Sequence, residues 1–279
     1  MASPDELRPF RLPLTMDGVD LYIAGMQREG SGTPLVFLHG LGSTKEDYAD
    51  VVRQQALSER PVLAYDAPGC GASTCSDLSA VSIPFLVTLA SAVLNAGGID
   101  RCRLIGHSMG GLTGLLLADR DPARVAGFVD IEGNVAPEDC FLSRQIISHP
   151  HPDPRGFLAE FADRVSASGE SSSALYASGQ LAKVRPEVVR PIFESMVELS
   201  DHGDLMRRFL ALPCPRMFVY GEENRSLSYL PGLAEFGVEL AEIAHSGHWP
   251  MYANAPEMWS RIAAFVRATE ADDEERRAS

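Results

Sequence analysis

The succession of elements along the sequence predicts an α/β protein built on a mostly parallel sheet. Residues 34–38 and 61–65 are continuous apolar runs, which is typical of strands buried on both faces of such a sheet. Helical patterns alternate with these and later strands, and this alternation implies right-handed crossovers. Between residues 135 and 208 no buried-strand run occurs, so this stretch is predicted to be a small helical subdomain and not a loop.

Each element is predicted from apolar periodicity and from the glycines and prolines that flank it. The first two strands alternate around Asp17-Gly18, which predicts a hairpin. The predicted strands cover residues 10–15, 19–24, 34–38, 61–65, 101–105, 125–131, 215–220 and 238–243. The predicted core helices cover residues 45–57, 83–95, 112–118 and about 256–268. Inside the inserted stretch, helical fragments are predicted at residues 157–165, 172–177, 186–199 and 204–210.

The composition is that of a globular protein with an acidic surface. The chain has 279 residues and a formal net charge of −14, which argues against nucleic acid and anionic membranes as partners. Its five cysteines are odd in number and lack metal-ligand spacing, so we expect free thiols in a reducing compartment. The N-terminus has no apolar leader and no apolar run approaches the roughly 18 residues of a membrane span, so we expect a cytoplasmic protein. The charged tail, residues 270–277, is expected to be a frayed, solvated end.

The stretch from Gly106 to Gly110 fits the pattern G-x-S-x-G, with a predicted strand before it and a predicted helix after it. A strand that turns sharply into a helix holds the central serine on a strained corner, where its hydroxyl is exposed. Small residues are needed at both glycines because the strand and helix backbones nearly touch there. We therefore predict that Ser108 is a nucleophile and that the backbone N–H of Met109 points into the site.

Four landmarks in order make the chain resemble the α/β-hydrolase superfamily over nearly its whole length. They are the His39-Gly40 loop, the loop at residues 66–73, the Ser108 corner, and His248 before a final helix. The resemblance implies an eight-stranded, mostly parallel sheet with a helical cap inserted after strand six. The core domain would comprise residues 1–134 and 209–279, and the cap residues 135–208.

A serine hydroxyl needs a base within hydrogen-bond reach, and histidine suits that role near neutral pH. His248 lies in Ser246-Gly247-His248-Trp249-Pro250, which resembles the histidine loop of the family. We predict that His248 is the base. His245 is expected to be an ordinary loop residue, and His107 is expected to point away from the face of Ser108.

The third member of a triad holds the histidine tautomer and stabilises the imidazolium. Most of the family places an aspartate after the seventh strand, but the matching position here holds Asn224. Glu132 ends the preceding strand, 24 residues after Ser108, which resembles a subgroup with its acid after strand six. We predict Glu132 as the acid. Asn224 or a neighbouring glutamate, and Asp130, remain alternatives, and Glu132 could instead cap the first helix of the insertion.

Attack at a carbonyl produces an oxyanion, which needs preorganised donors. Resemblance to the family assigns these to the backbone N–H groups of Met109 and Leu41, while Asp66 and Ser73 are expected to brace their loop. Residues that could face the pocket, although most are expected to be cap core, are Phe141, Arg144, Phe157, Phe161, Tyr176, Met196 and Trp249.

These features predict a serine hydrolase that cleaves a small-molecule carboxylic ester, lactone or thioester through an acyl-enzyme. Alternatives are a non-hydrolytic enzyme of the same fold, such as an acyltransferase, lyase or perhydrolase, and a ligand-binding protein. No metal or organic cofactor is expected, because no cysteine–histidine cluster occurs and Gly69-Cys70-Gly71 lacks dinucleotide-binding spacing. The expected partner is a small-molecule substrate, and a homodimer is compatible with the sequence.

Overall fold

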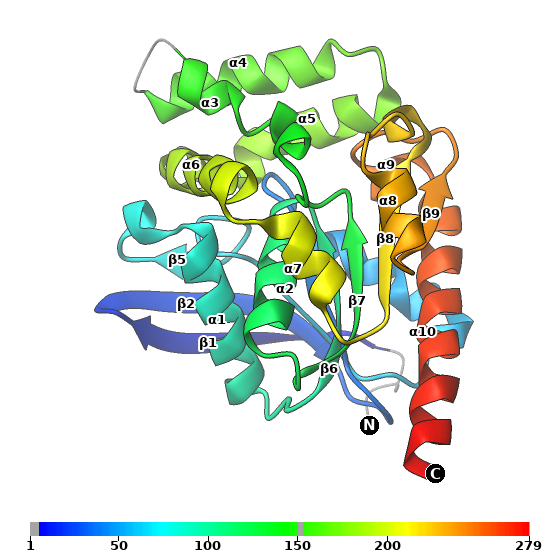
Figure 1. The fold of residues 1–279 in the computed structure, drawn as a ribbon. Coiled ribbons are helices and arrows are strands. Elements are labelled where there is room, and N and C mark those ends of the chain that lie inside the picture. The colour runs from blue at the N-terminus through cyan, green and yellow to red at the C-terminus, as the bar shows by residue number, and fades with distance from the viewer. Residues whose placement is uncertain (1–5, 150–152, 279) are drawn as a thin grey trace.

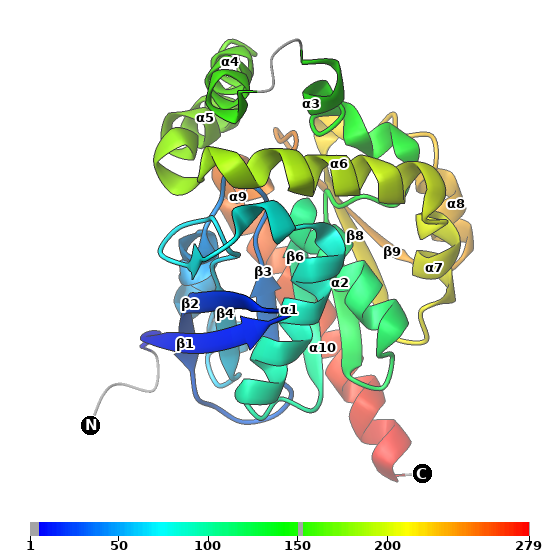
Figure 2. The same ribbon diagram turned by 90° about the vertical axis from the view of Figure 1, so that its left-hand side faces the viewer.

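The fold is a mostly parallel sheet with helices on both faces and a layer of helices over one end. The computed structural model describes residues 6–149 and 153–278. Figure 1 shows helices α3 (Gln145–Ser148) to α6 (Pro186–His202) lying above the sheet. Figure 2 shows α1 (Ile83–Ala96) and α2 (Met109–Arg120) in front of the sheet, with α10 (Ala255–Ala278) behind it.

Eight strands form the sheet in the order β1-β2-β4-β3-β6-β7-β8-β9, and the two-residue strand β5 pairs with β2 beside this path. The first pairs, β1 with β2 and β2 with β4, are antiparallel, and the pairs from β4 to β9 are parallel. The strands are β1 Arg8–Met16, β2 Val19–Arg28, β3 Leu35–Leu38, β4 Val62–Tyr65, β5 Thr74–Cys75, β6 Cys102–His107, β7 Val125–Ile131, β8 Arg216–Gly221 and β9 Glu239–Ile243. The predicted eight-stranded, mostly parallel sheet is therefore confirmed.

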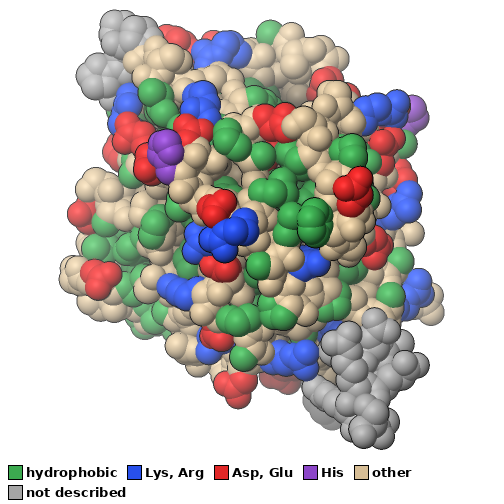
Figure 3. Space-filling model, in the orientation of Figure 1, with side chains coloured by type: hydrophobic (Ala, Val, Ile, Leu, Met, Phe, Trp, Pro, Cys, Tyr) green, Lys and Arg blue, Asp and Glu red, His purple; other side chains and the backbone are tan. Residues whose placement is uncertain are grey.

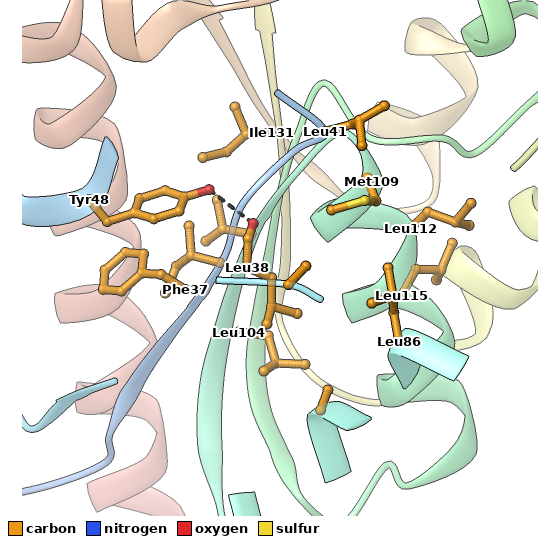
Figure 4. Close-up of a cluster of buried hydrophobic side chains, with 14 of the residues drawn as sticks. Phe37, Leu38, Leu41, Tyr48, Leu86, Leu104, Met109, Leu112, Leu115 and Ile131 are labelled. Carbon is orange, nitrogen blue, oxygen red and sulfur yellow. Dashed lines mark hydrogen bonds between the residues drawn. The ribbon is translucent and has the colours of Figure 1, made fainter. Parts of the chain in front are cut away.

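The central strands are apolar along their whole length because both of their faces are covered. All residues of β3, β4, β6 and β7 are buried. Figure 4 shows part of this core: Phe37 of β3 lies beside Tyr48 on one side of the sheet, and Leu112 and Leu115 of helix α2 (Met109–Arg120) lie on the other side. The hydroxyl of Tyr48 donates to the carbonyl of Leu38 at 3.0 Å and so ties the segment after β3 back to the strand.

The core helices mostly match their predicted positions. They are α1 Ile83–Ala96, α2 Met109–Arg120, α7 Leu205–Ala211, α8 Leu230–Glu235, α9 Pro250–Ala253 and α10 Ala255–Ala278. The helix predicted at residues 45–57 is instead two 3₁₀ helices, η1 Lys45–Arg53 and η2 Gln55–Leu57. The buried residues of this segment, Tyr48, Val51 and Leu57, recur at multiples of three, a spacing that fits the three residues per turn of a 3₁₀ helix as well as one face of an α-helix.

The charged C-terminal tail was wrongly predicted to be a frayed end. Helix α10 continues to Ala278, ten residues beyond the predicted end. Glu270 anchors its later part, because its carboxylate contacts Arg60 at 2.5 Å and Arg103 at 3.5 Å. The sequence beyond residue 268 contains no glycine or proline that would stop a helix.

The inserted stretch forms the cap helices. They are η4 Pro137–Phe141, α3 Gln145–Ser148, α4 Pro154–Ser166, α5 Ser171–Lys183 and α6 Pro186–His202. The insertion leaves the sheet after β7, the sixth of the eight ordered strands. The cap is joined to the loop after β4 by two backbone hydrogen bonds, Gly71 N–H to Lys183 and Arg185 N–H to Gly69, both 2.8 Å. The predicted cap boundary at residue 208 falls within α7.

The surface mixes charges of both signs. On the face shown in Figure 3, basic side chains lie singly or in small groups among acidic ones. All five cysteines are free, in agreement with the expectation of thiols. Within residues 6–149 and 153–278, no helix is long and apolar enough to cross a bilayer.

Candidate active site

Ser108 lies at the sharp turn between β6 and α2, as the sequence predicts. Its φ of 51° and ψ of −116° are strained for a residue with a side chain. The turn is held by the Ser108 N–H, which donates to the carbonyl of Ile131 at 2.9 Å. A side chain at Gly106 would overlap the carbonyl of Gly110, and one at Gly110 would overlap the carbonyl of Leu38. The corner therefore requires glycine at both positions.

Glu132 and His248 meet at the carboxyl end of the sheet. Glu132 directly follows β7 with a φ of 51°, and its Oε2 lies 3.4 Å from Nδ1 of His248. Both residues are buried, so this contact is shielded from solvent. With Nδ1 turned to the carboxylate, the other ring nitrogen of His248 is left for the cavity that it lines together with Ser108.

Two donors from the end of β8 also hold the Glu132 carboxylate. The N–H of Gly221 donates to Oε1 at 2.6 Å, and Nδ2 of Asn224 donates to Oε2 at 2.7 Å. The structure thus brings Glu132 and Asn224 together, with the amide bound to the carboxylate and not to the imidazole. These two hydrogen bonds fix both oxygens of the carboxylate.

The other candidate acids have different neighbours. Asp130 is fully buried against Gly111 and Gly133, and burial raises its pKa well above the usual range, which disfavours the charged form that a triad acid needs. Glu222 accepts a hydrogen bond from the N–H of His245 at 2.8 Å. The first cap helix is capped by another residue, Asp139, which accepts from the N–H groups that precede that helix. The capping interpretation of Glu132 is therefore wrong.

His107 has a position that its sequence neighbourhood did not predict. Its Nε2 donates to the backbone carbonyl of His248 at 2.8 Å, and the two rings lie 5.0 Å apart. Burial lowers the pKa of His107 well below its usual value, and its carbonyl partner requires a proton on Nε2. The sequence signal for this contact is a histidine at the end of a buried strand, directly before Ser108.

The segment that follows β3 approaches Ser108 through Leu41, which lines the same cavity. Figure 4 shows Leu41 near Met109, the first residue of α2. The hydroxyl of Tyr176, from cap helix α5, donates to the carbonyl of Leu41 at 2.8 Å. The Tyr176 ring also stacks on Trp249 at 4.4 Å, so one cap residue contacts both loops beside the cavity.

The loop at residues 66–73 is braced as expected. The Asp66 carboxylate accepts from the backbone N–H groups of Lys45 and Ala72, both at 2.9 Å. The hydroxyl of Ser73 donates to the carbonyl of Asp66 and accepts from the N–H of Ala24. These contacts confirm a structural role for both residues.

The cavity beside Ser108 is small and almost closed by the cap. Its volume is about 20 Å³, about the space of one ordered water. The residues that line it are Leu41, Ser108, Asn134, Asp139, Leu142, Ser143, Phe161, Tyr176, Phe193, Met196, His248 and Trp249. A wider cleft of about 290 Å³ lies on the other side of Leu142, His248 and Trp249, and it is lined in part by Phe141.

Two of the residues considered for the pocket lie elsewhere. Phe157 is fully buried in the cap core, where its ring contacts Phe161 and Phe193. Arg144 forms a two-pronged ion pair with Asp201 on the cap surface, at 2.6 and 2.9 Å. The surface assignment of Arg144 is thus confirmed.

A carboxyl pair from the cap and the core stands at the mouth of the wider cleft. Both carboxyl groups lie beside the backbone of Gly247. A Cβ atom built on this glycine would be 2.6 Å from an oxygen of Glu223 and 3.3 Å from an oxygen of Glu170. The hydrogen bond with Glu170 raises the pKa of Glu223 to about 7.

Among residues 6–149 and 153–278, no group of three or more His, Cys, Asp or Glu side chains could hold a metal ion.

Comparison with known proteins gives a consistent result. A model described as the alpha/beta hydrolase family matches residues 35–262. The chain is 30% identical over 211 residues to the pimeloyl-[acyl-carrier protein] methyl ester esterase of Aeromonas salmonicida, a match that covers 70% of this chain and 79% of the esterase. It is 34% identical over 115 residues to the sn-1-specific diacylglycerol lipase ABHD11 of Xenopus tropicalis, covering 41% of this chain but only 35% of the lipase.

Solved structures share the fold at low sequence identity. A carboxylesterase of Nitrososphaera gargenis has a TM-score of 0.75 at 17% identity, and the match covers 94% of this chain and 100% of the carboxylesterase. The N-acyl homoserine lactonase AidH has a TM-score of 0.72 at 20% identity, covering 95% of this chain and 98% of the lactonase. At such identities the likeness concerns the fold alone.

Proposed function

This chain belongs to the alpha/beta hydrolase family, and we propose that it is a serine hydrolase of small-molecule carboxylic esters, lactones or thioesters. In this proposal Ser108 is the nucleophile, His248 the general base and Glu132 the acid that holds the imidazole. The observation that carries it is the cavity shared by Ser108 and His248, with Nδ1 of His248 turned to the buried Glu132 carboxylate.

The first half of the reaction forms an acyl-enzyme. Ser108 Oγ attacks the substrate carbonyl while Nε2 of His248 takes the hydroxyl proton. The imidazolium then carries hydrogens on both nitrogens, and Glu132 stabilises it through Nδ1–H. The oxyanion accepts hydrogen bonds from the N–H groups of Leu41 and Met109, a type of contact worth about 2.7–4 kcal/mol per donor in the transition state. Collapse of the intermediate breaks the bond to the alcohol or thiol, which leaves with the proton from Nε2.

The second half regenerates the serine. Water attacks the acyl-serine carbonyl and gives its proton to Nε2 of His248, which returns it to Ser108 Oγ as the acid product leaves. Neither half requires a group beyond the protein, the substrate and water.

Asn224 has a supporting part in this mechanism. It occupies the place where most of the family has an aspartate, and it donates to Glu132 at 2.7 Å. An amide there cannot supply a negative charge, but it fixes one carboxylate oxygen, while Gly221 fixes the other. We infer that the pair keeps the Glu132 carboxylate oriented toward His248.

A fluorophosphonate probe tests the proposal because it phosphonylates only an activated serine. Labelling is expected in the wild type and absent in Ser108→Ala. The histidine loop offers a matched pair, His248→Asn and His245→Asn, since His245 is exposed and has a positive φ that asparagine tolerates. Labelling should be lost in the first and kept in the second. Equal labelling of the two variants, or labelling of Ser108→Ala, contradicts the assignment.

A further inference from the structure

Two buried polar groups on the wall of the small cavity have hydrogen-bonding capacity that the protein does not use. Ser143 lies between cap helices η4 and α3 and is 2% exposed. Within the described part of the chain, its hydroxyl oxygen is buried without a hydrogen-bond partner. Leaving a buried hydroxyl unsatisfied is destabilising, so this group is expected to form a hydrogen bond when the site is filled.

Asn134 supplies the second group. It is also 2% exposed, and its Nδ2 donates to the hydroxyl of Ser200 at 3.1 Å and to the sulfur of Cys140 at 3.3 Å. Both amide hydrogens are thereby used, and only the acceptor Oδ1 is left for a ligand. The contact with Cys140 also brings Asn134 to the helical turn that carries Ser143, because Arg144 N–H donates back to the Cys140 carbonyl at 2.9 Å.

The third polar residue on this wall is already occupied. Asp139 accepts from two backbone N–H groups at 2.8 Å and from the hydroxyl of Tyr229 at 2.7 Å. The unused set is therefore one acceptor, on Asn134, and one hydroxyl that can donate, on Ser143. A hydroxyl group on a ligand matches both, since it can donate to the amide oxygen and accept from the serine.

The cavity that contains this pair suits the acyl part of a substrate. Ser108 lines the small cavity, and His248 lines both this cavity and the wider cleft, so the acyl group bonded to Ser108 can lie in the small cavity while the leaving group, which takes its proton from His248, extends toward the wider cleft. The small cavity is closed on its remaining sides by the apolar side chains of Phe161, Phe193 and Met196. Its volume of about 20 Å³ is that of one water, so an acyl group enters only when the cap residues shift, and the polar pair then lies beside that group.

We propose that the enzyme selects esters, lactones or thioesters of hydroxy acids, whose acyl hydroxyl binds Ser143 and Asn134. This inference rests on the proposed function, since it concerns the same site. Acyl groups without a hydroxyl are disfavoured, because they would leave both polar groups unpaired.

The test compares ethyl esters that differ by one hydroxyl. The pairs are ethyl lactate with ethyl propanoate, and each enantiomer of ethyl 3-hydroxybutanoate with ethyl butanoate. Acid release is followed by pH-stat, and each kcat/KM is divided by the rate of alkaline hydrolysis of the same ester to remove the inductive effect of the hydroxyl. Two added hydrogen bonds predict a preference of about 10- to 100-fold for the hydroxy ester of at least one pair.

Variants then assign the preference to its residue. Ser143→Ala should bring the ratio of the two rates close to one, and a folding defect would not do so because it lowers both rates alike. Ser148→Ala, an exposed serine in the same segment, is the matched control and should keep the wild-type ratio. A ratio near one in the wild type means that the pair holds only water and overturns the proposal, as does a preference that Ser143→Ala leaves unchanged.

The same data separate this inference from the function on which it rests. Hydrolysis of the plain esters without a hydroxyl preference overturns the inference alone. Phosphonylation of Ser108 without turnover of any ester also overturns it alone. Absence of both labelling and turnover overturns the inference and the proposed function together.

Discussion

Replacing Glu132 with glutamine removes the charge from the proposed acid while keeping the shape of its side chain. In the native protein Oε1 accepts from the Gly221 N–H at 2.6 Å, and Oε2 accepts from Asn224 at 2.7 Å with His248 Nδ1 3.4 Å away. In the variant the amide oxygen has to stay on Gly221, because an NH₂ group there would face a backbone N–H that cannot rotate. The NH₂ group therefore faces His248 and donates to Nδ1, which moves the imidazole proton to Nε2.

An imidazole with its proton on Nε2 has no lone pair to offer to Ser108. The corresponding Asp-to-Asn change in a serine protease triad lowers kcat by about 10⁴ through this tautomer exchange. Asn224 can turn its amide to accept from the new NH₂ group, which relieves the local clash but does not return the lone pair to Nε2. We therefore expect kcat/KM to fall by about 10³ to 10⁴, equivalent to about 4–5.5 kcal/mol of barrier.

The assay is steady-state hydrolysis of p-nitrophenyl acetate, with the melting temperature measured on the same samples. Glu138→Gln is the matched control, because the exposed Glu138 carboxylate also accepts from a backbone N–H and a hydroxyl, both of Ser228. That variant should keep wild-type kinetics. If a correctly folded Glu132→Gln protein retained more than about a tenth of the wild-type activity, the reasoning from tautomer to rate would be refuted.

Three further changes probe contacts around this centre. Tyr176→Phe removes the hydrogen bond to the Leu41 carbonyl but keeps the ring, so steady-state kinetics should show kcat falling about tenfold with KM nearly constant, and a change in KM alone would count against it. His107→Phe removes the donor to the His248 carbonyl and should slow phosphonylation about tenfold, whereas an unchanged rate would deny it a positioning role. A neighbouring cap carboxyl raises the pKa of Glu223 from an ordinary 4.5 to about 7, so the folded state binds more protons than the unfolded state in this window. The free energy of unfolding should therefore fall as the pH rises from about 4.5 to about 7, and denaturant titrations of Glu223→Gln should show a smaller decrease; an equal decrease in both proteins would contradict this.

The sequence was most informative where burial alone determines the residue pattern. The range 125–131 was predicted as a strand and is β7 at the same residues, because every side chain in it faces the core. The prediction failed where one residue pattern fits two kinds of helix. Residues 45–57 have buried positions at multiples of three, which fit an α-helix and a 3₁₀ helix alike, and the segment forms 3₁₀ helices.

Contacts between distant segments could not be read from either partner alone. The sequence offered Glu132 and Asn224 as rivals for one role, whereas the fold places them in hydrogen-bond contact across 92 positions of the chain. The support of His248 by His107 spans 141 positions and likewise depends on the closing of the sheet. Local patterns identify which groups are present, but the strand order decides which of them meet.

The hydrogen bonds from Gly221 and Asn224 keep the Glu132 carboxylate attached to the core and not to the cap. The small cavity must open to admit an ester, and Glu132 lies only a few residues before the start of the cap. Its carboxylate is nevertheless bound by Gly221 and Asn224, both at the end of core strand β8, so cap movement need not disturb the contact with His248.

The loop that contains Leu41, which is proposed to bind the oxyanion, is held by a residue of the cap. Tyr176 of cap helix α5 holds the Leu41 carbonyl, so any displacement of α5 would break this hydrogen bond, whereas the two donors that hold Glu132 belong to the core. An open form would then have its base in place and its oxyanion loop unrestrained. Return of the cap over a bound substrate would restore the donor geometry, so that transition-state stabilisation is complete only when the cavity is closed to water.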